Sequence, residues 1–208
     1  MSDRKLLVYG FGGHARSVAD VALCCGYTHL VFVDAQARPH EAFIGHPVVP
    51  TFEHLQGGWS EAIAASGDGS KRQSQLDELT QLGFQVVSVL SPRSTIACNA
   101  EVAMGSFVGH HAHIGPSARV GRGVIINTAA VVEHDTYVGD YAHVSVNATL
   151  AGSSGMGNFS MLGAGATVID GITIGDHITV GAGSVVIQSI VTPGVYAGVP
   201  CQSIRKQP

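Results

Sequence analysis

The sequence has few charged side chains and few aromatic ones. Charged residues make up 12% and aromatic residues 6% of the 208 residues. Lysine and arginine together number 11 and the formal net charge is -4, so no broad basic surface is available for a nucleic-acid backbone. No apolar run reaches the roughly 18 residues of a membrane span, and the first residues do not read as a secretory signal. We therefore expect a cytoplasmic protein that binds neither nucleic acid nor membrane.

Cysteine is also scarce, with four residues in the chain. Cys24 and Cys25 are adjacent, whereas Cys98 and Cys201 are isolated. This arrangement makes neither a CxxC pair nor a disulfide framework. We interpret all four as ordinary packing residues in a reducing compartment.

Glycine is plentiful, with 27 residues, and the second half of the chain repeats. From Leu90 onward, every sixth residue is aliphatic or methionine. The series contains Leu90, Ile96, Val102, Val108, Ile114, Val120, Ile126, Val132, Val138, Val144, Leu150, Met156, Leu162, Val168, Ile174, Val180 and Val186. Small or β-branched residues recur four positions after most of them, and glycine often follows directly.

A six-residue period fits neither a helix nor a simple alternating strand. It returns one side chain to the interior after a short strand and a corner, so three repeats close a triangular coil whose neighbours stack about 4.8 Å apart. This is the pattern of the left-handed parallel β-helix, an exception to right-handed crossovers. A valine-rich sandwich, the alternative, would alternate with irregular turn spacing.

The first part of the chain alternates between strand-like and helix-like segments. Strands are predicted at 6–9, 29–34, 59–66 and 84–90, and helices at 14–25 and 70–83. The sequence therefore predicts a truncated Rossmann-like α/β domain of parallel strands over residues 1–90. An all-β left-handed β-helix with a C-terminal cap follows over residues 91–208.

The glycine turn after the first strand is a candidate binding site. Gly10, Gly12 and Ala15 fit a GxGxxA fingerprint, and Asp34 follows nineteen residues after Ala15. A helix N-terminus with close backbone access favours any pyrophosphate. The short domain and the attached β-helix favour the diphosphate of a nucleotide sugar over a dinucleotide or a purely structural turn.

Three motifs together resemble one protein family along nearly the whole chain. They are YGFGGHARSVADVA near the start, VVEHD with HVSVNATLAG in the β-helix, and VYAGVPCQSIRK near the end. The sequence is similar to bacterial sugar acetyltransferases of the PglD/NeuD type. The resemblance implies an acetyl-CoA-dependent N-acetyltransferase that acts on the 4-amino group of a nucleotide-activated 4-amino-4,6-dideoxy sugar, with UDP as the expected nucleotide. A triangular β-helix exposes flat faces rich in valine and isoleucine that usually pack around a threefold axis, so we expect a homotrimer with active sites between subunits. We expect no metal.

The resemblance assigns the catalytic roles to the VVEHD segment and its neighbours. His134 is implied as the general base, because an imidazole titrates near neutral pH. Asp135 is implied as the carboxylate that holds its tautomer, although Glu133 is a competing partner. His143 is implied near the thioester carbonyl and Asn127 near the sugar amine, where either can stabilise the attacking nitrogen or the oxyanion.

The expected binding residues lie along both domains. Gly152 follows His134 by 18 residues, one full coil, and should lie directly beside it. The expected coenzyme A contacts are His143, Ala151, Gly152, Gly163, Gly181 and Pro200. The expected sugar-nucleotide contacts are Gly12, Gly13, His14, Asp34 and Arg72. The helix that contains Arg72 also reads as an amphipathic helix with a solvated face.

Other functions remain open at this point. A sialic-acid-type sugar O-acetyltransferase would differ only in its acceptor, a hydroxyl in place of an amine. A γ-carbonic-anhydrase-like protein would bind zinc or iron, and His110, His111 and His113 are close in sequence. Their spacing does not reproduce the three-histidine pattern of such sites. A non-catalytic sugar-nucleotide binding module would have no need of His134.

Overall fold

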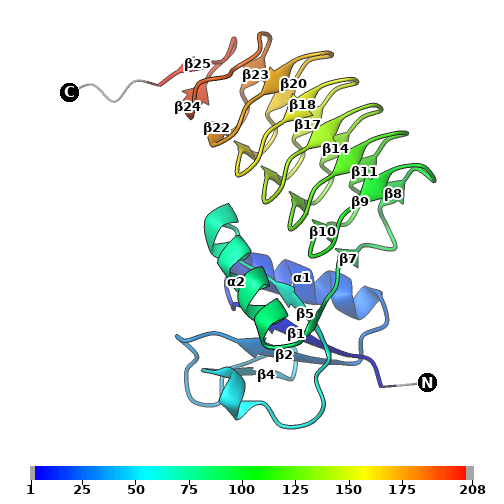
Figure 1. Ribbon diagram of the computed structural model, residues 1–208, viewed down its shortest axis with the longest axis vertical. Helices are drawn as coiled ribbons and strands as arrows, with labels where there is room; N and C mark the ends of the chain where they lie inside the picture. Colours follow the sequence, from blue (N-terminus) through cyan, green and yellow to red (C-terminus); the bar gives the residue numbers. More distant parts are fainter. Residues whose placement is uncertain (1–2, 205–208) are drawn as a thin grey trace.

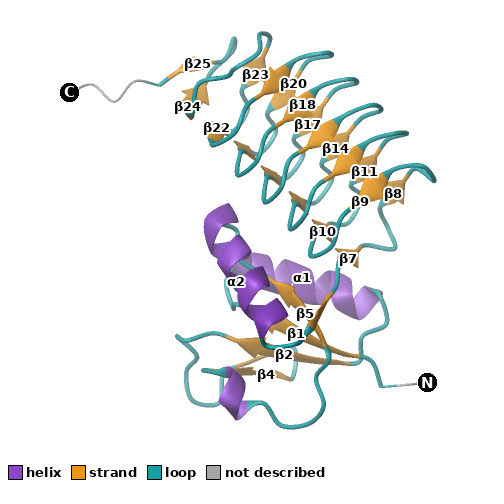
Figure 2. Cartoon of the chain, viewed as in Figure 1, coloured by secondary structure: helices purple, strands orange, loops and turns teal. Residues whose placement is uncertain are grey.

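The computed structural model describes residues 3–204 and contains two domains joined end to end (Figure 1). The first domain is a sheet with helices, and the second is a stack of short strands and turns (Figure 2). None of the helices within residues 3–204 combines the length and apolar character that crossing a membrane requires.

The N-terminal domain is a six-stranded sheet in the order β3-β4-β2-β1-β5-β6, and neighbouring strands are parallel except β3 and β4. Its strands are β1 (Lys5–Tyr9), β2 (His29–Val33), β3 (Ala42–Phe43), β4 (His46–Val49), β5 (Glu61–Ala64) and β6 (Gln85–Val86), and its helices are α1 (Gly13–Cys24), the 3-10 turn η1 (Phe52–His54) and α2 (Gly69–Gln81). The chain order reverses between β1 and β5. Ligands bind beyond the carboxyl ends of strands at such a point.

The two helices cover opposite faces of this sheet because successive strand residues point to opposite sides. Leu6 and Val8 pack with α1, whereas Leu7 packs with α2. Asp68 caps α2 by accepting a hydrogen bond from the Lys71 amide at 2.8 Å. The helices predicted at 14–25 and 70–83 are thus present as α1 (Gly13–Cys24) and α2 (Gly69–Gln81).

The second domain is a three-sided coil. The strands of the first face are β7 (Val89–Leu90), β10 (Phe107–Val108), β13 (Ile125–Ile126), β16 (His143–Val144), β19 (Met161–Leu162) and β22 (Ile178–Val180). Those of the second face are β8 (Thr95–Ile96), β11 (His113–Ile114), β14 (Val131–Val132), β17 (Thr149–Leu150), β20 (Thr167–Val168) and β23 (Val185–Val186). Those of the third face are β9 (Glu101–Val102), β12 (Arg119–Val120), β15 (Tyr137–Val138), β18 (Gly155–Met156) and β21 (Thr173–Ile174).

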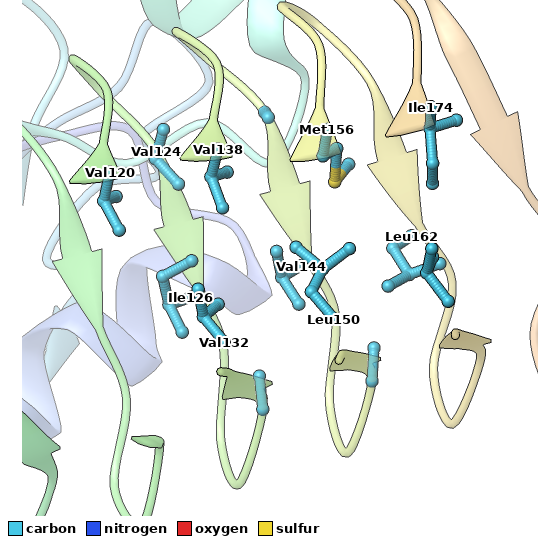
Figure 3. Packing of buried hydrophobic residues seen from close by; sticks show 14 of the residues in the cluster. Val120, Val124, Ile126, Val132, Val138, Val144, Leu150, Met156, Leu162 and Ile174 are labelled. Atoms are coloured by element: carbon cyan, nitrogen blue, oxygen red, sulfur yellow. The ribbon is translucent and has the colours of Figure 1, made fainter. Parts of the chain in front are cut away.

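The register follows the repeat seen in the sequence. Val108 pairs with Ile126, and Ile126 pairs with Val144, so each coil advances the chain by 18 residues. The inward aliphatic column is closed to solvent, with Val132, Val144 and Leu150 each 0% exposed (Figure 3). Strands β24 (Gly194–Ala197) and β25 (Gln202–Ser203) extend the first face and end the described chain. Arg205 and Lys206, the end of the VYAGVPCQSIRK motif, lie outside the described residues.

The domains share a continuous core. Phe107 and Ile125 point outward from the first face and belong to the same buried cluster as Ala15 and Val18 of α1. The segment predicted as one strand at 84–90 divides here. Residues of β6 join the N-terminal sheet, whereas β7 already pairs with β10 in the β-helix. The β3–β4 hairpin and η1 were not predicted.

Candidate active site

His134 lies at the corner between the second and third faces, in the turn that joins β14 to β15. Asp135 has φ of 57°, a left-handed conformation that aspartate tolerates better than most residues. Nδ1 of His134 lies 2.8 Å from Oδ2 of Asp135, and the His134 side chain is 56% exposed. An ionised Asp135 accepts a hydrogen bond from the protonated Nδ1, so Nε2 carries the free lone pair that a base needs.

The electrostatics of this corner favour the protonated ring. The pKa of His134 is raised, first by the hydrogen bond to Asp135, against a smaller opposing effect of burial, with further help from the charges of Asp135, Glu133 and Asp170. Glu133 directs Oε2 to the backbone amide of His134 at 3.3 Å rather than to the ring. Of the two carboxylates left open by the sequence, Asp135 is therefore the one that holds Nδ1.

Gly152 lies against the His134 ring on the next coil. The Ser153 amide donates to the His134 carbonyl at 2.9 Å, which sets the two corners side by side. A Cβ atom at position 152 would lie 2.5 Å from Nε2 of His134. The absence of a side chain there leaves room for the ring, while the neighbouring Ala151 is half-buried.

A second group of polar side chains lies on the first face, beside the N-terminal domain. Nδ2 of Asn127 lies 3.3 Å from Nε2 of His143, and Oδ1 of Asn127 accepts the Thr128 amide at 2.8 Å. This amide orientation makes Nε2 of His143 an acceptor and leaves its proton on Nδ1. The ring of His14, at the start of α1, is centred 6.4 Å from that of His143.

Both of these histidines are held neutral. Burial, with the nearby charge of Arg72, lowers the pKa of His143 to about 4. Burial, then His143 and Arg72, lowers the pKa of His14 to about 3. Nε2 of His14 is buried and has no hydrogen-bond partner among residues 3–204. The His14 and His143 rings thus contribute uncharged polar atoms at the domain junction.

The chain does not bring His134 and His143 together. His134 lies at the corner between the second and third faces, whereas His143 projects from the first face, on β16. In a three-sided coil, a corner lies opposite the remaining face. The two histidines of the VVEHD and HVSVNATLAG segments therefore point away from each other within one chain.

The expected coenzyme contacts are similarly divided. Gly163 and Gly181 follow β19 and β22, at the corner between the first and second faces, whereas Ala151 and Gly152 lie at the corner between the second and third. A Cβ at Gly163 would lie 2.6 Å from the Ala182 amide nitrogen, so coil stacking alone requires a glycine there. Pro200 lies in the loop after β24, where its side chain is exposed, and the Val199–Pro200 peptide bond is cis.

Two adjoining cavities open at the carboxyl ends of β1, β2 and β5. One, of about 370 Å³, is lined by residues that include Gly12, Gly13 and His14. The other, of about 540 Å³, extends toward Phe52. Asp34 borders both and accepts the Phe11 amide through Oδ2 at 2.8 Å, which fixes the glycine turn.

Lys71 and Gln75 line both cavities and were missed by the sequence reasoning. Both residues face the cavities because α2 packs beside the glycine turn. The polar sequence of this helix predicted a solvent-exposed face and therefore did not indicate that these residues line a binding site. Lys71 supplies a cation beside the helix N-terminus of α1, where phosphate groups are favoured. Together with Gly12, Gly13, His14 and Asp34, it forms a suitable site for a nucleotide diphosphate.

Arg72 differs from its expected role. It is 1% exposed and donates its hydrogen bonds to backbone carbonyls, so it does not face either cavity. Burial lowers the pKa of Arg72 to about 10, which still leaves the side chain charged at neutral pH. Arg72 therefore does not line the substrate cavities as the sequence predicted.

The histidines at 110–113 do not converge on a metal. Nδ1 of His110 lies 2.6 Å from Oγ of Ser91, and its Nε2 lies 3.1 Å from Oδ2 of Asp20. Nδ1 of His113 lies 2.8 Å from Oγ1 of Thr95. Across residues 3–204, no three His, Cys, Asp or Glu side chains are grouped as a metal site.

Comparison with known proteins places this geometry in a family. Residues 5–79 match the PglD N-terminal domain. The acetyltransferase domain of PglB from Neisseria gonorrhoeae FA1090 is 32% identical with a TM-score of 0.90, over 97% of this chain and 100% of that one, and the same domain has been solved with acetyl coenzyme A. PerB from Caulobacter crescentus, solved with CoA and GDP-perosamine, is 31% identical with a TM-score of 0.88, over 97% of each chain.

A more distant structure, WeeI from Acinetobacter baumannii AYE, is 21% identical with a TM-score of 0.84 over 97% of this chain and 100% of that one, and it supports the fold alone. These similarities confirm the predicted fold, a Rossmann-like domain followed by a left-handed β-helix, and the predicted acetyl-CoA-dependent chemistry. The chain belongs to the PglD-type family of left-handed β-helix sugar acetyltransferases.

Proposed function

We propose that the chain transfers the acetyl group of acetyl-CoA to the 4-amino group of a nucleotide-activated 4-amino-4,6-dideoxy sugar. The observation that carries this proposal is the exposed His134–Asp135 pair, at 2.8 Å, on a scaffold that matches the CoA- and GDP-perosamine-bound PerB. Since acetyl-CoA is the donor, we place the reaction in the cytoplasm.

The proposed chemistry is a direct transfer with no acyl-enzyme. Nε2 of His134 accepts a proton from the substrate amine as its nitrogen attacks the thioester carbonyl. The new C–N bond forms, the C–S bond breaks, and CoA leaves as the thiolate, which takes up a proton. Asp135 stabilises the imidazolium through Nδ1, as the carboxylate does in a Ser-His-Asp triad.

We further propose that each active site lies between two subunits of a homotrimer. His134 and His143 face opposite directions in one chain, so a site that uses both needs two chains. The second face suits packing around a threefold axis, because the outward residues of its last five strands carry no carboxylate, lysine or arginine. These residues are His113, Val131, Thr149, Thr167 and Val185. Buried interface cores are depleted in charge.

This arrangement also brings the divided glycines together. With the second faces around the axis, the His134–Gly152 corner of one subunit meets the Gly163–Gly181 corner of the next. Coenzyme A would lie between those corners. The nucleotide would occupy the cavities at His14 of the subunit that supplies His143 and Asn127, with its sugar amine directed to the neighbouring His134.

The proposal is tested by thiol release from acetyl-CoA in the presence of UDP-, GDP- and dTDP-linked 4-amino sugars. We expect release with at least one amino sugar and none with the matched 4-hydroxy sugar. UDP remains the predicted nucleotide, and the GDP-perosamine bound to PerB makes the GDP sugar the first comparison. Release with the hydroxy sugar alone would instead indicate an O-acetyltransferase.

A further inference from the structure

Arg72 joins three backbone segments from both domains. Each of its contacts is to a carbonyl oxygen: Nε donates to Gly123 at 2.5 Å, Nη1 to Ser66 at 2.8 Å and Gly67 at 3.1 Å, and Nη2 to Tyr141 at 2.6 Å and Ala142 at 3.2 Å. A guanidinium has five N–H donors in a rigid plane, and here five carbonyls receive them. The side chain therefore holds the Ser66–Gly67 loop and two coils of the β-helix in one fixed relation.

The guanidinium has no carboxylate partner in this position. None of the ion pairs formed within the described part of the chain includes Arg72. Burying a cation is costly, and here the hydrogen bonds to five backbone carbonyls offset that cost. The planar fork of the guanidinium also fixes the positions of these carbonyls relative to one another, which no apolar side chain does.

The first two turns of α2 also press directly on the β-helix. A Cβ at Gly69 would lie 2.6 Å from the carbonyl oxygen of Tyr141, and one at Gly123 would lie 2.8 Å from Cδ1 of Leu76. Both contacts fall along the corner between the third and first faces. The helix is thus seated against two successive coils, with Arg72 between them.

The segments joined by Arg72 belong to the two halves of the proposed site. Ser66 and Gly67 line the 370 Å³ cavity together with His14 and the glycine turn. Tyr141 and Ala142 immediately precede His143, whose ring contacts Asn127. Small errors in the placement of a reacting group reduce turnover strongly even when binding is retained.

We propose that Arg72 is a positioning residue that fixes the nucleotide cavity relative to His143, and thereby sets where the amino group of the bound sugar stands. This inference rests on the proposed function. It predicts a specific division of effects: turnover of the nucleotide sugar depends on Arg72, whereas affinity for the nucleotide and for CoA does not.

The test compares Arg72→Lys with the wild-type trimer. Lysine keeps the charge but has three donors without the planar fork. We expect kcat for the nucleotide amino sugar to fall about 10- to 100-fold, with the Kd values for free nucleoside diphosphate and CoA unchanged by calorimetry. Asp77→Asn is the matched control, because it breaks a surface ion pair from α2 to Arg122, at 3.3 Å, without touching the carbonyl contacts. It should retain wild-type turnover.

Gly69→Ala is a second variant that keeps the buried cation in place. Its methyl group displaces the first turn of α2 from Tyr141, so it should show the same loss of kcat with unchanged affinities. Loss of nucleotide affinity with normal kcat in either variant would overturn the proposal, because Arg72 would then support the cavity alone. Full turnover in Arg72→Lys would overturn it as well.

Hydrogen–deuterium exchange separates this inference from the proposed function. Arg72→Lys should accelerate exchange at residues 66–69 and 141–143 and leave the coils beyond residue 160 unchanged. If the wild-type protein acetylates no nucleotide amino sugar, the proposed function fails, and the exchange pattern still decides the role of Arg72. Unchanged exchange in both segments would contradict that role.

Discussion

Gly152 and His134 lie on adjacent coils so closely that a methyl group at position 152 would stand 2.5 Å from Nε2 and 2.6 Å from Cε1 of the imidazole. The glycine therefore determines where the proposed base can sit. Because the opposing atoms are the far end of an exposed side chain, the ring can rotate away from an added methyl group without disturbing the coil.

Gly152→Ala should consequently impair catalysis far more than folding. We expect kcat to fall by about 10- to 1,000-fold as the base leaves its working position, while the Tm stays close to that of the wild type. Gly155→Ala is the control, since a Cβ there would make its nearest contact at 3.5 Å, with Thr173. Equal turnover in the two variants would remove the Gly152–His134 contact from the mechanism.

His134→Ala should reduce kcat by about 10²- to 10⁴-fold, the usual effect of losing a general base. CoA affinity should change little, because the ring is proposed to act on the acceptor amine. Steady-state thiol release and calorimetry with CoA give the two quantities. Turnover at the wild-type level would exclude His134 as the base.

Asp135→Asn should change the pH dependence of kcat/KM. The hydrogen bond to Asp135 raises the pKa of His134, and the base works only when deprotonated, so activity is lost as pH falls through that pKa. Asparagine tolerates the left-handed φ of 57° and removes the charge, which lowers the pKa and moves the acidic limb to lower pH. Glu133→Gln should shift the limb less. An unmoved limb in Asp135→Asn would contradict the assigned pairing.

The buried histidines should make the fold sensitive to acid. The pKa of His14 is lowered to about 3, so between that value and its ordinary pKa the unfolded chain binds more protons than the folded one. Stability should therefore fall as pH decreases from 7 to 5, by about 2 kcal/mol for this residue. Urea unfolding at both pH values measures the loss.

His14→Gln should reduce that pH-dependent loss by about the same 2 kcal/mol. The control is His111→Asn, an exposed position with φ of 60° that asparagine accepts, and it should behave like the wild type. An identical loss in wild type and His14→Gln would show that His14 is not held neutral by the fold.

Much of this architecture can be predicted from the sequence because every coil repeats the same pattern of inward aliphatic residues. The six-residue aliphatic column fixes the inward positions, so His134 could be placed at a corner and Gly152 beside it without a structure. The glycine turn and Asp34 likewise predict the cavity at the switch between β1 and β5.

The remaining features depend on contacts between distant segments. Arg72 sits in a helix whose polar residues suggest a solvated face, and only the docking of α2 on Gly123 and Tyr141 buries it. The strand β3 (Ala42–Phe43) has two residues, too few to show alternation. The strand predicted at 84–90 divides because β6 (Gln85–Val86) pairs with β5 whereas β7 (Val89–Leu90) pairs with β10. The opposed directions of His134 and His143 follow from which faces their strands join, which sequence spacing alone did not make evident.

Mixing of inactive subunits tests the intersubunit site most directly. His134→Ala and His143→Ala trimers should each be nearly inactive, and their subunits can be combined by co-expression in equal amounts with two affinity tags. If His134 of one subunit works with His143 of the next, each mixed trimer contains one intact site of three, so mixed trimers purified through both tags should show about a third of wild-type turnover. Mixed trimers that remain as inactive as their parents would contradict a site shared between subunits.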